Sequence, residues 1–271
     1  MNTEYYISKK GEKIPIEKVK VLITVKTYPL PSNEYQELVC TAGVKEDGSW
    51  IRLYPIPFRH LPYAQQYKKW DWIELGVAKH EGDVRSESYR PCGEIKIIGH
   101  IETKNNWEER KKLALKYIEP ALESIKEKTQ KGISLIVIKP KEILDFIIED
   151  ASGEWKDKWQ IIFKQGKLFG TPQKPLEKIP YKFSYKFKCG GKDCNGHKIM
   201  IEDWEIYELY RNMLQRYGTK EIALEKVKDK YFNMFPKEND LYFFMGTTKK
   251  DHHRGTFVII GLFYPKKQLN L

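Results

Sequence analysis

Residues 181–188 alternate between aromatic side chains and lysine or serine, and this pattern constrains the fold more than any other in the chain. The segment reads Tyr-Lys-Phe-Ser-Tyr-Lys-Phe-Lys, so an aromatic ring stands at each odd position. Because side chains of a β-strand point alternately to its two faces, the period of two predicts a strand with one aromatic and one lysine face. Four large rings are too much apolar surface to leave in water, so we expect the aromatic face to pack on a core.

The predicted strand runs directly into a glycine-rich turn that carries three potential metal ligands. Cys189, Cys194 and His197 have the spacing C-x4-C-x2-H. Two thiolates and an imidazole this close on a glycine-rich turn can fold around one tetrahedral zinc ion, so we expect a zinc site in residues 189–197, called here the knob. The alternative is a turn with two free thiols, and an open fourth position would indicate a catalytic zinc. Candidates for the fourth ligand are Glu202, Asp203, Glu205, His252 and His253.

The net charge of +11 is concentrated in one part of the chain. Residues 154–200 hold 11 lysines and four acidic residues, a surplus of seven. A local basic surface beside a metal-like turn favours a polyanionic partner, with nucleic acid first. A membrane surface would require a basic amphipathic helix, whereas this segment reads as strands and turns. The candidate phosphate contacts are Lys182, Lys186, Lys188, Lys192 and Lys198.

The N-terminal part of the chain has the pattern of a small β-barrel. Residues 37–55 read as a hairpin, because Asp47-Gly48 lies between two apolar runs. Together with expected strands at 19–29, 70–79 and 93–102, the short spacing suggests an OB-like or PUA-like barrel. Trp50 is expected in its core. Arg52 and Arg59 stand among aromatic residues and are further candidates for nucleic-acid contact.

The hairpin also resembles a known group of domains. Cys40-Thr-Ala-Gly-Val, followed by Gly48-Ser-Trp-Ile-Arg52, resembles the opening hairpin of nucleic-acid-binding domains called the dual-OB group. The resemblance covers about 20 of 271 residues and implies a barrel and nucleic-acid binding, but no catalytic residue. The C-terminal half resembles an uncharacterised prokaryotic family, and that resemblance implies no activity.

The periodicity changes after the barrel, and we expect an α+β chain of two domains. Residues 107–131 read as an amphipathic helix that Pro120 kinks, and 133–138 as an apolar strand. A polar connection at 150–154 separates the predicted domains, 1–150 with the barrel and helix and 151–271 with the basic strand and the zinc knob. In the second domain we also expect helices at 203–217 and 219–235 and strands at 198–201, 241–245 and 256–263.

Two clusters are compatible with catalysis. His197, Asp203 and Glu205 could form a metal-dependent nuclease site, although Asp203 is also a good helix N-cap and Glu205 would lie in the favoured first turn. Glu94-Ile95-Lys96, with Asp71 or Asp83 upstream, has the E-x-K pattern of restriction-type nucleases, but Glu and Lys also alternate on many solvated strands.

The pattern as a whole favours a nucleic-acid-binding protein with a structural zinc, acting as one component of a larger complex. The N-terminus lacks a secretory h-region and no apolar run reaches about 18 residues, so we expect a cytoplasmic protein. In that compartment the four cysteines fit a metal site better than disulfides. The alternatives are a metal-dependent nuclease and an adaptor that binds an acidic protein. RNA and DNA are not distinguished.

Overall fold

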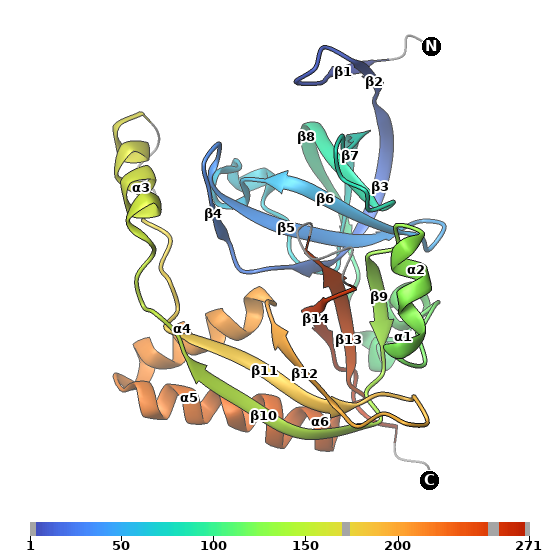
Figure 1. Ribbon diagram of the computed structural model, residues 1–271, viewed down its shortest axis with the longest axis vertical. Helices are drawn as coiled ribbons and strands as arrows, with labels where there is room; N and C mark the ends of the chain where they lie inside the picture. The colour runs from blue at the N-terminus through green and yellow to red at the C-terminus, as the bar shows by residue number, and fades with distance from the viewer. Residues whose placement is uncertain (1–3, 170–173, 249–254, 269–271) are drawn as a thin grey trace.

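The computed structural model describes residues 4–169, 174–248 and 255–268, which form two β-rich domains (Figure 1). A short hairpin of β1 (Tyr5–Ile7) and β2 (Lys13–Pro15) precedes the first domain. The strands of the first sheet are β3 (Glu17–Lys26), β4 (Leu30–Ser32), β5 (Gln36–Lys45), β6 (Trp50–Ile56), β7 (Asp71–Lys79) and β8 (Ser88–His100).

The first domain is a five-stranded closed β-barrel, as the sequence predicted. Its strands follow the order β3-β7-β8-β6-β5, and pairing of β3 with β5 closes the barrel, while β4 extends the β5 edge. Apolar side chains from alternate positions, including Val21, Ile23, Ile51 and Leu53, fill the interior. The predicted turn of the 37–55 hairpin is confirmed, since Gly48 has a φ of +82° that favours glycine.

The connection between the domains differs from the single kinked helix that the sequence predicted. It consists of α1 (Lys104–Ala114), a 3-10 turn η3 (Glu123–Ile125) and α2 (Lys126–Gln130). The chain between α1 and η3 runs beside β9, where the Glu119 backbone N–H donates to the Val137 carbonyl at 2.8 Å. Pro120 cannot donate a helical hydrogen bond, and this pairing replaces the helix there.

The second domain is a six-stranded mixed sheet covered on one face by helices. The strand order is β10 (Glu142–Asp150), β11 (Tyr181–Lys188), β12 (His197–Ile201), β14 (Phe257–Phe263), β13 (Tyr242–Thr247) and β9 (Leu135–Ile138). The helical segments are α4 (Trp204–Tyr217), α5 (Lys220–Lys228), the π-helical turn η4 (Asp229–Met234) and α6 (Phe235–Glu238).

The aromatic face of β11 packs on the core of the second domain, which confirms the alternation argument. Phe183, Tyr185 and Phe187 are fully buried, whereas Lys182 and Lys186 are exposed on the other face. The Tyr185 hydroxyl donates to the Tyr231 carbonyl at 2.6 Å, so the one polar atom of this buried ring is satisfied.

The predicted boundary at 150–154 is placed too late in the chain. Strands β9 and β10 belong to the second sheet, so the second domain begins before Leu135. The residues after β10 lead instead into α3 (Asp157–Phe169), which projects from the body between β10 and β11 (Figure 1). The two domains share a core, in which Leu22, Val25 and Val44 of the barrel meet Val137 and Phe244 of the second sheet.

Among the described residues, no helix is long and apolar enough to cross a membrane.

Candidate metal centre and candidate nucleic-acid cleft

The three predicted metal ligands of the knob lie together, and Glu123 completes the group. One ligand atom from each of Glu123, Cys189, Cys194 and His197 lies within 4.8 Å of all the others, so this group could hold a metal ion. The His197 Nε2 atom is 3.2 Å from the Cys194 Sγ, 3.4 Å from the Cys189 Sγ and 3.1 Å from a Glu123 carboxylate oxygen. Four donors around one point match a tetrahedral site.

Close backbone packing brings Glu123 to the knob. The Gly190 N–H donates to the Pro120 carbonyl at 2.9 Å. A Cβ atom on Gly190 would lie 2.4 Å from that oxygen, and one on Gly191 would lie 2.9 Å from the Glu123 carboxylate. The two glycines are therefore needed for the knob to approach the 120–123 segment. The sequence interpretation missed Glu123 because it lies 66 residues before Cys189.

Three of the predicted fourth ligands, Glu202, Asp203 and Glu205, are not beside the knob, and the proposed nuclease cluster is wrong for the same reason. His197 begins β12, and at 3.3 Å per residue the other end of this five-residue strand, Ile201, is about 13 Å away. Asp203 follows two residues beyond Ile201. Asp203 caps α4 by accepting from the Glu205 N–H at 3.2 Å, which is the structural role weighed against catalysis. His252 and His253 lie outside the described residues.

The second predicted nuclease pattern is also dispersed. Glu94 and Lys96 are exposed on β8, and Lys96 faces Glu74 across the pair with β7. The Asp71 carboxylate accepts from the His100 Nδ1 at 2.6 Å, and Asp83 pairs with Arg85 at 2.6 Å. Neither aspartate is available beside Glu94 as a metal ligand.

The lysine face of β11 is opposed by acidic residues of β10. In the antiparallel register, Lys182 faces Glu149, Lys186 faces Asp145 and Lys188 faces Glu142. Ion pairs join Lys188 to Glu142 at 3.7 Å and Lys198 to Glu149 at 2.8 Å. The strand is thus exposed as expected, but a row of carboxylates lies beside its lysines and reduces the local positive potential. Lys192 is exposed on the knob.

Arg52 does not lie on the surface, so its predicted contact with a phosphate there is wrong. Its side chain is 3% exposed and reaches across the domain junction, where it donates to the Cys40 Sγ at 3.1 Å and the Ser134 hydroxyl at 3.2 Å. Trp50, predicted to be a core residue, is half-buried and packs its ring edge-on against Phe244 of the second sheet, 5.6 Å between centroids. Both residues therefore help to join the two domains.

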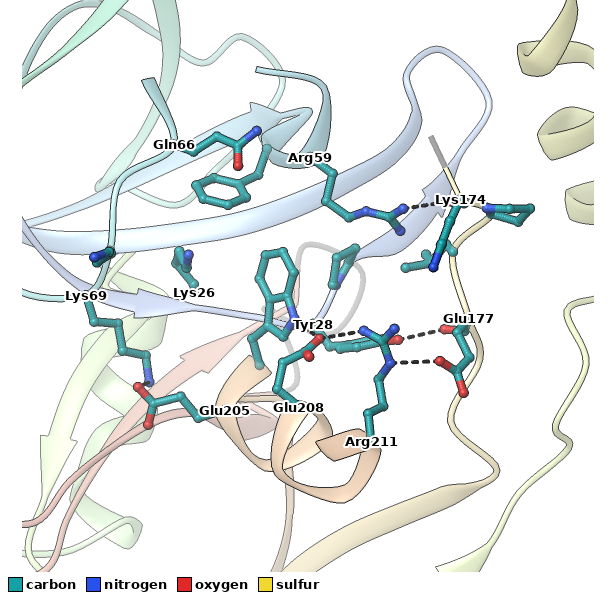
Figure 2. Close-up of a pocket in the computed structure, with 16 residues that line it drawn as sticks. Lys26, Tyr28, Arg59, Gln66, Lys69, Lys174, Glu177, Glu205, Glu208 and Arg211 are labelled. Carbon is teal, nitrogen blue, oxygen red and sulfur yellow. Dashed lines mark hydrogen bonds and ion pairs between the residues drawn. The ribbon is translucent and has the colours of Figure 1, made fainter. Parts of the chain in front are cut away.

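A cleft of about 600 Å³ lies between the barrel and α4 (Figure 2). The barrel contributes Lys26, Phe58, Arg59, Gln66, Lys68 and Lys69, and the second domain contributes Lys174, Glu177, Trp204, Glu205, Glu208 and Arg211. Six cations and three carboxylates line it, together with the rings of Tyr28, Phe58 and Trp204. Arg59, one of the predicted contacts, lies here, and Figure 2 shows it reaching the backbone of Lys174.

Half of the cations of the cleft are engaged by carboxylates. Lys69 pairs with Asp203 at 2.7 Å and with Glu205 at 3.2 Å, while Arg211 pairs with Glu177 at 2.7 Å and Glu208 at 2.9 Å. Arg59 pairs with the buried Glu37 at 3.2 Å, from outside the cleft. Within the described part of the chain, no carboxylate forms an ion pair with the other three, Lys26, Lys68 and Lys174.

Lys26 is held in an aromatic environment at the base of the cleft. Its Nζ lies 3.9 Å from the centroid of Phe58 and 5.0 Å from that of Trp204, and it donates to the Tyr67 carbonyl at 3.2 Å. Burial, helped by the charge of Lys69, lowers the pKa of Lys26 to about 8. Sequence analysis did not identify this residue, because its surroundings come from loops and helices far along the chain.

Two families of unknown function match the sequence. The one described as Domain of unknown function (DUF8758) matches residues 17–116, which is the barrel and α1. The one described as Domain of unknown function (DUF8757) matches residues 119–271, which is the segment of Glu123 and the whole second sheet. The junction between the matches agrees with a domain boundary before β9. No curated protein matches the chain.

Proposed function

The chain belongs to the family described as Domain of unknown function (DUF8757), which names no activity, and we propose from the geometry of the cleft that it binds nucleic acid. The observation that supports this proposal is the meeting, in one cleft, of cations without carboxylate partners and aromatic rings from both domains. Cations recognise phosphates, and aromatic faces stack on bases whatever their sequence. The cleft therefore offers both kinds of contact that a nucleotide strand needs.

Lys26 strengthens the case for an anionic ligand. A lysine placed among rings, with a second lysine nearby and no carboxylate paired with it, costs stability in its charged form. A phosphate in the cleft would supply the missing negative charge. The exposed Lys68 and Lys174 lie on the two sides of the same cleft and would extend the contact along a backbone.

Zinc is the metal that the donor set of the knob fits best. Two cysteines, one histidine and one glutamate provide thiolate, imidazole and carboxylate ligands, all of which zinc accepts in tetrahedral sites. The ion would fasten the knob to the 120–123 segment and hold Lys192 and Lys198 on a rigid support. With no open position left by the four side chains, the role that we propose for it is structural.

The basic strand is a second contact surface in this proposal. The candidates for phosphate binding on this strand are still Lys182, Lys186 and Lys188. Because the acidic row of β10 lies beside them, each should attract a phosphate less strongly than an unpaired lysine of the cleft does. We therefore expect the cleft to contribute more of the binding free energy than the strand.

Salt dependence distinguishes the two surfaces. Lys68→Gln with Lys174→Gln removes two exposed cations from the cleft, and Lys182→Gln with Lys186→Gln removes two exposed cations from the strand. Measured by fluorescence anisotropy with labelled RNA and DNA, the cleft variant should reduce the slope of log affinity against log salt by about 1.4–1.8, with uniform weakening across sequences.

The matched strand variant should change the slope by less. A larger effect of the strand pair would make β11 the main contact and overturn the assignment to the cleft. Wild-type protein that binds neither RNA nor DNA at low salt would overturn the proposed function, and the adaptor for an acidic protein would then be the better interpretation.

Binding should also depend on pH through Lys26. Its pKa in the free protein is about 8, so the amine loses its charge above that pH. Binding of a polyanion then requires the amine to take up a proton from solution. Affinity should therefore be flat up to about pH 7 and fall between about pH 8 and 10. The facing charged groups are Lys69, which lowers this pKa, and Asp71, Asp203 and Glu205, which raise it.

Lys26→Met is the control for this pH dependence. The variant should bind more weakly at pH 7 and show no decline of the wild-type size between pH 8 and 10. It should also be at least as stable as the wild type at pH 7, because a buried charge has been removed. If the wild type and Lys26→Met lose affinity in parallel, Lys26 does not contact the ligand.

A further inference from the structure

A second cavity, of about 230 Å³, lies between the barrel and strands β13 and β14. None of its lining residues lines the cleft, so it is a separate site. Its walls combine apolar side chains from both domains with hydroxyl, thiol, guanidinium, imidazole and carboxyl groups. The residues that matter for its chemistry are Leu30, Arg52, Tyr54, His80, Glu202 and Ile260.

Two polar groups of opposite type at this cavity have hydrogen-bonding capacity that no described residue uses. Within the described residues, nothing donates to the carboxyl of Glu202, which follows β12. Arg52 donates through Nη1 to the Cys40 Sγ and through Nη2 to Ser134, and its unpaired Nε is buried. The donor that this side chain can offer to the cavity is the second hydrogen of Nη1, for which no described residue is an acceptor. Burial raises the pKa of Glu202, and the positive charge of Arg52 opposes that rise, so the two side chains interact electrostatically. An acceptor and a donor left unsatisfied at one cavity mark a place for a ligand with complementary groups.

The lining and size of the cavity suit a small aromatic ligand. Leu30, Val258 and Ile260 provide apolar walls. The Tyr54 ring, 36% exposed, lies beside the His80 ring with 6.3 Å between centroids and 31° between planes. At roughly 30 Å³ per water molecule, the volume would hold about eight waters, so it is smaller than the sites of drug-sized ligands and suits a single small heterocycle.

We propose that this cavity binds one guanine base, whose adjacent N–H groups donate to the Glu202 carboxylate and whose carbonyl oxygen faces Arg52. Guanine presents two donors and one acceptor side by side on one edge, which is the pattern that an unsatisfied carboxylate and guanidinium require. The base stacks against Tyr54. Because its pairing edge contacts the protein, it must be a base that is not paired in a duplex. It comes either from a free nucleoside or from an unpaired nucleotide of a bound strand, and only the second source rests on the function proposed above.

Free nucleosides test the cavity without the cleft. Isothermal titration should show guanosine binding at least about tenfold more tightly than adenosine, cytidine or uridine. Inosine, which lacks the 2-amino group, should bind several-fold more weakly than guanosine. Glu202→Gln should remove the preference for guanosine, whereas Glu225→Gln on the exposed face of α5 should leave it unchanged. Wild-type protein that does not distinguish guanosine from inosine or adenosine would overturn the proposal, whether or not the Glu202 variant folds.

Oligonucleotides distinguish the two sources. An oligonucleotide with one unpaired guanine should bind wild-type protein about tenfold more tightly than the same strand with adenine there, and Glu202→Gln should equalise the two. The Lys68→Gln and Lys174→Gln variant should weaken both strands equally and keep the preference. Guanosine selectivity without any selectivity among oligonucleotides assigns the cavity to a free nucleoside. Loss of binding to all strands with retained guanosine binding overturns the cleft alone.

Discussion

Replacement of Asp203 by alanine is expected to lower the free energy of unfolding by about 3–5 kcal/mol. The Asp203 side chain has no exposed surface, and both of its oxygens lie 2.7 Å from the Lys69 Nζ. It also accepts from the Leu262 N–H at 3.0 Å and caps α4. Burial lowers the pKa of Lys69, but the carboxylates of Asp203 and Glu205 outweigh it and raise that pKa. Burial raises the pKa of Asp203 to about 6, which is still below neutral pH, so both groups are charged at pH 7. Among the described residues, removal of the carboxylate leaves this buried ammonium with Glu205 as its one remaining ion-pair partner.

Asp203→Asn and Lys69→Met separate the contributions to this cost. Asparagine still caps the helix, so Asp203→Asn should cost less than Asp203→Ala. Because the two residues are in contact, Lys69→Met combined with Asp203→Asn should cost less than the sum of the single changes. Urea unfolding with an unchanged m value measures each effect. An Asp203→Ala variant within about 1 kcal/mol of the wild type would show that the domain junction does not depend on this pair.

Removal of zinc is expected to have the second large effect. Untagged protein should contain one zinc per chain, and Cys189→Ser with Cys194→Ser should abolish it in elemental analysis. If free zinc is about 1,000 times its dissociation constant, the ion adds about 4 kcal/mol to stability. For a domain of 150–250 residues this corresponds to roughly 8–16 °C in Tm, since about 1 kcal/mol shifts Tm by 2–4 °C. A chelator should lower the Tm of the wild type by that amount and leave the double serine variant unchanged.

Glu123 gives this experiment an internal control. Its side chain is 53% exposed, whereas Cys189 is buried. Glu123→Gln should therefore retain zinc with lower affinity, and the chelator should remove it more readily than from the wild type. Metal-free wild-type protein that melts at the same temperature with and without chelator would end the zinc assignment, and Cys189 and Cys194 would then be two thiols of a glycine-rich turn.

Local patterns determined what the sequence could reveal. The alternation in 181–188 predicted both the strand and its buried face, because a period of two is a property of the backbone itself. The turn at Asp47-Gly48 and the cap at Asp203 depend on residues within a few positions, and both were identified. The spacing of Cys189, Cys194 and His197 was sufficient to identify three members of the group that could hold a metal ion, since they lie within nine residues of one another.

The remaining features depend on residues that only the tertiary structure brings together. Glu123 reaches the knob from another segment, and Arg52 is buried because Ser134, 82 positions away, lies across the domain junction. The acidic row that faces the lysines of β11 belongs to β10, a strand that the sequence did not predict. The cleft likewise forms where Lys26 of the barrel meets Trp204 of α4. Sequence alone determined which side chains carry charge and which face of a strand is apolar, because these are local properties. Which charges remain unpaired was decided by the tertiary structure, because pairing depends on distances between segments that no local pattern encodes.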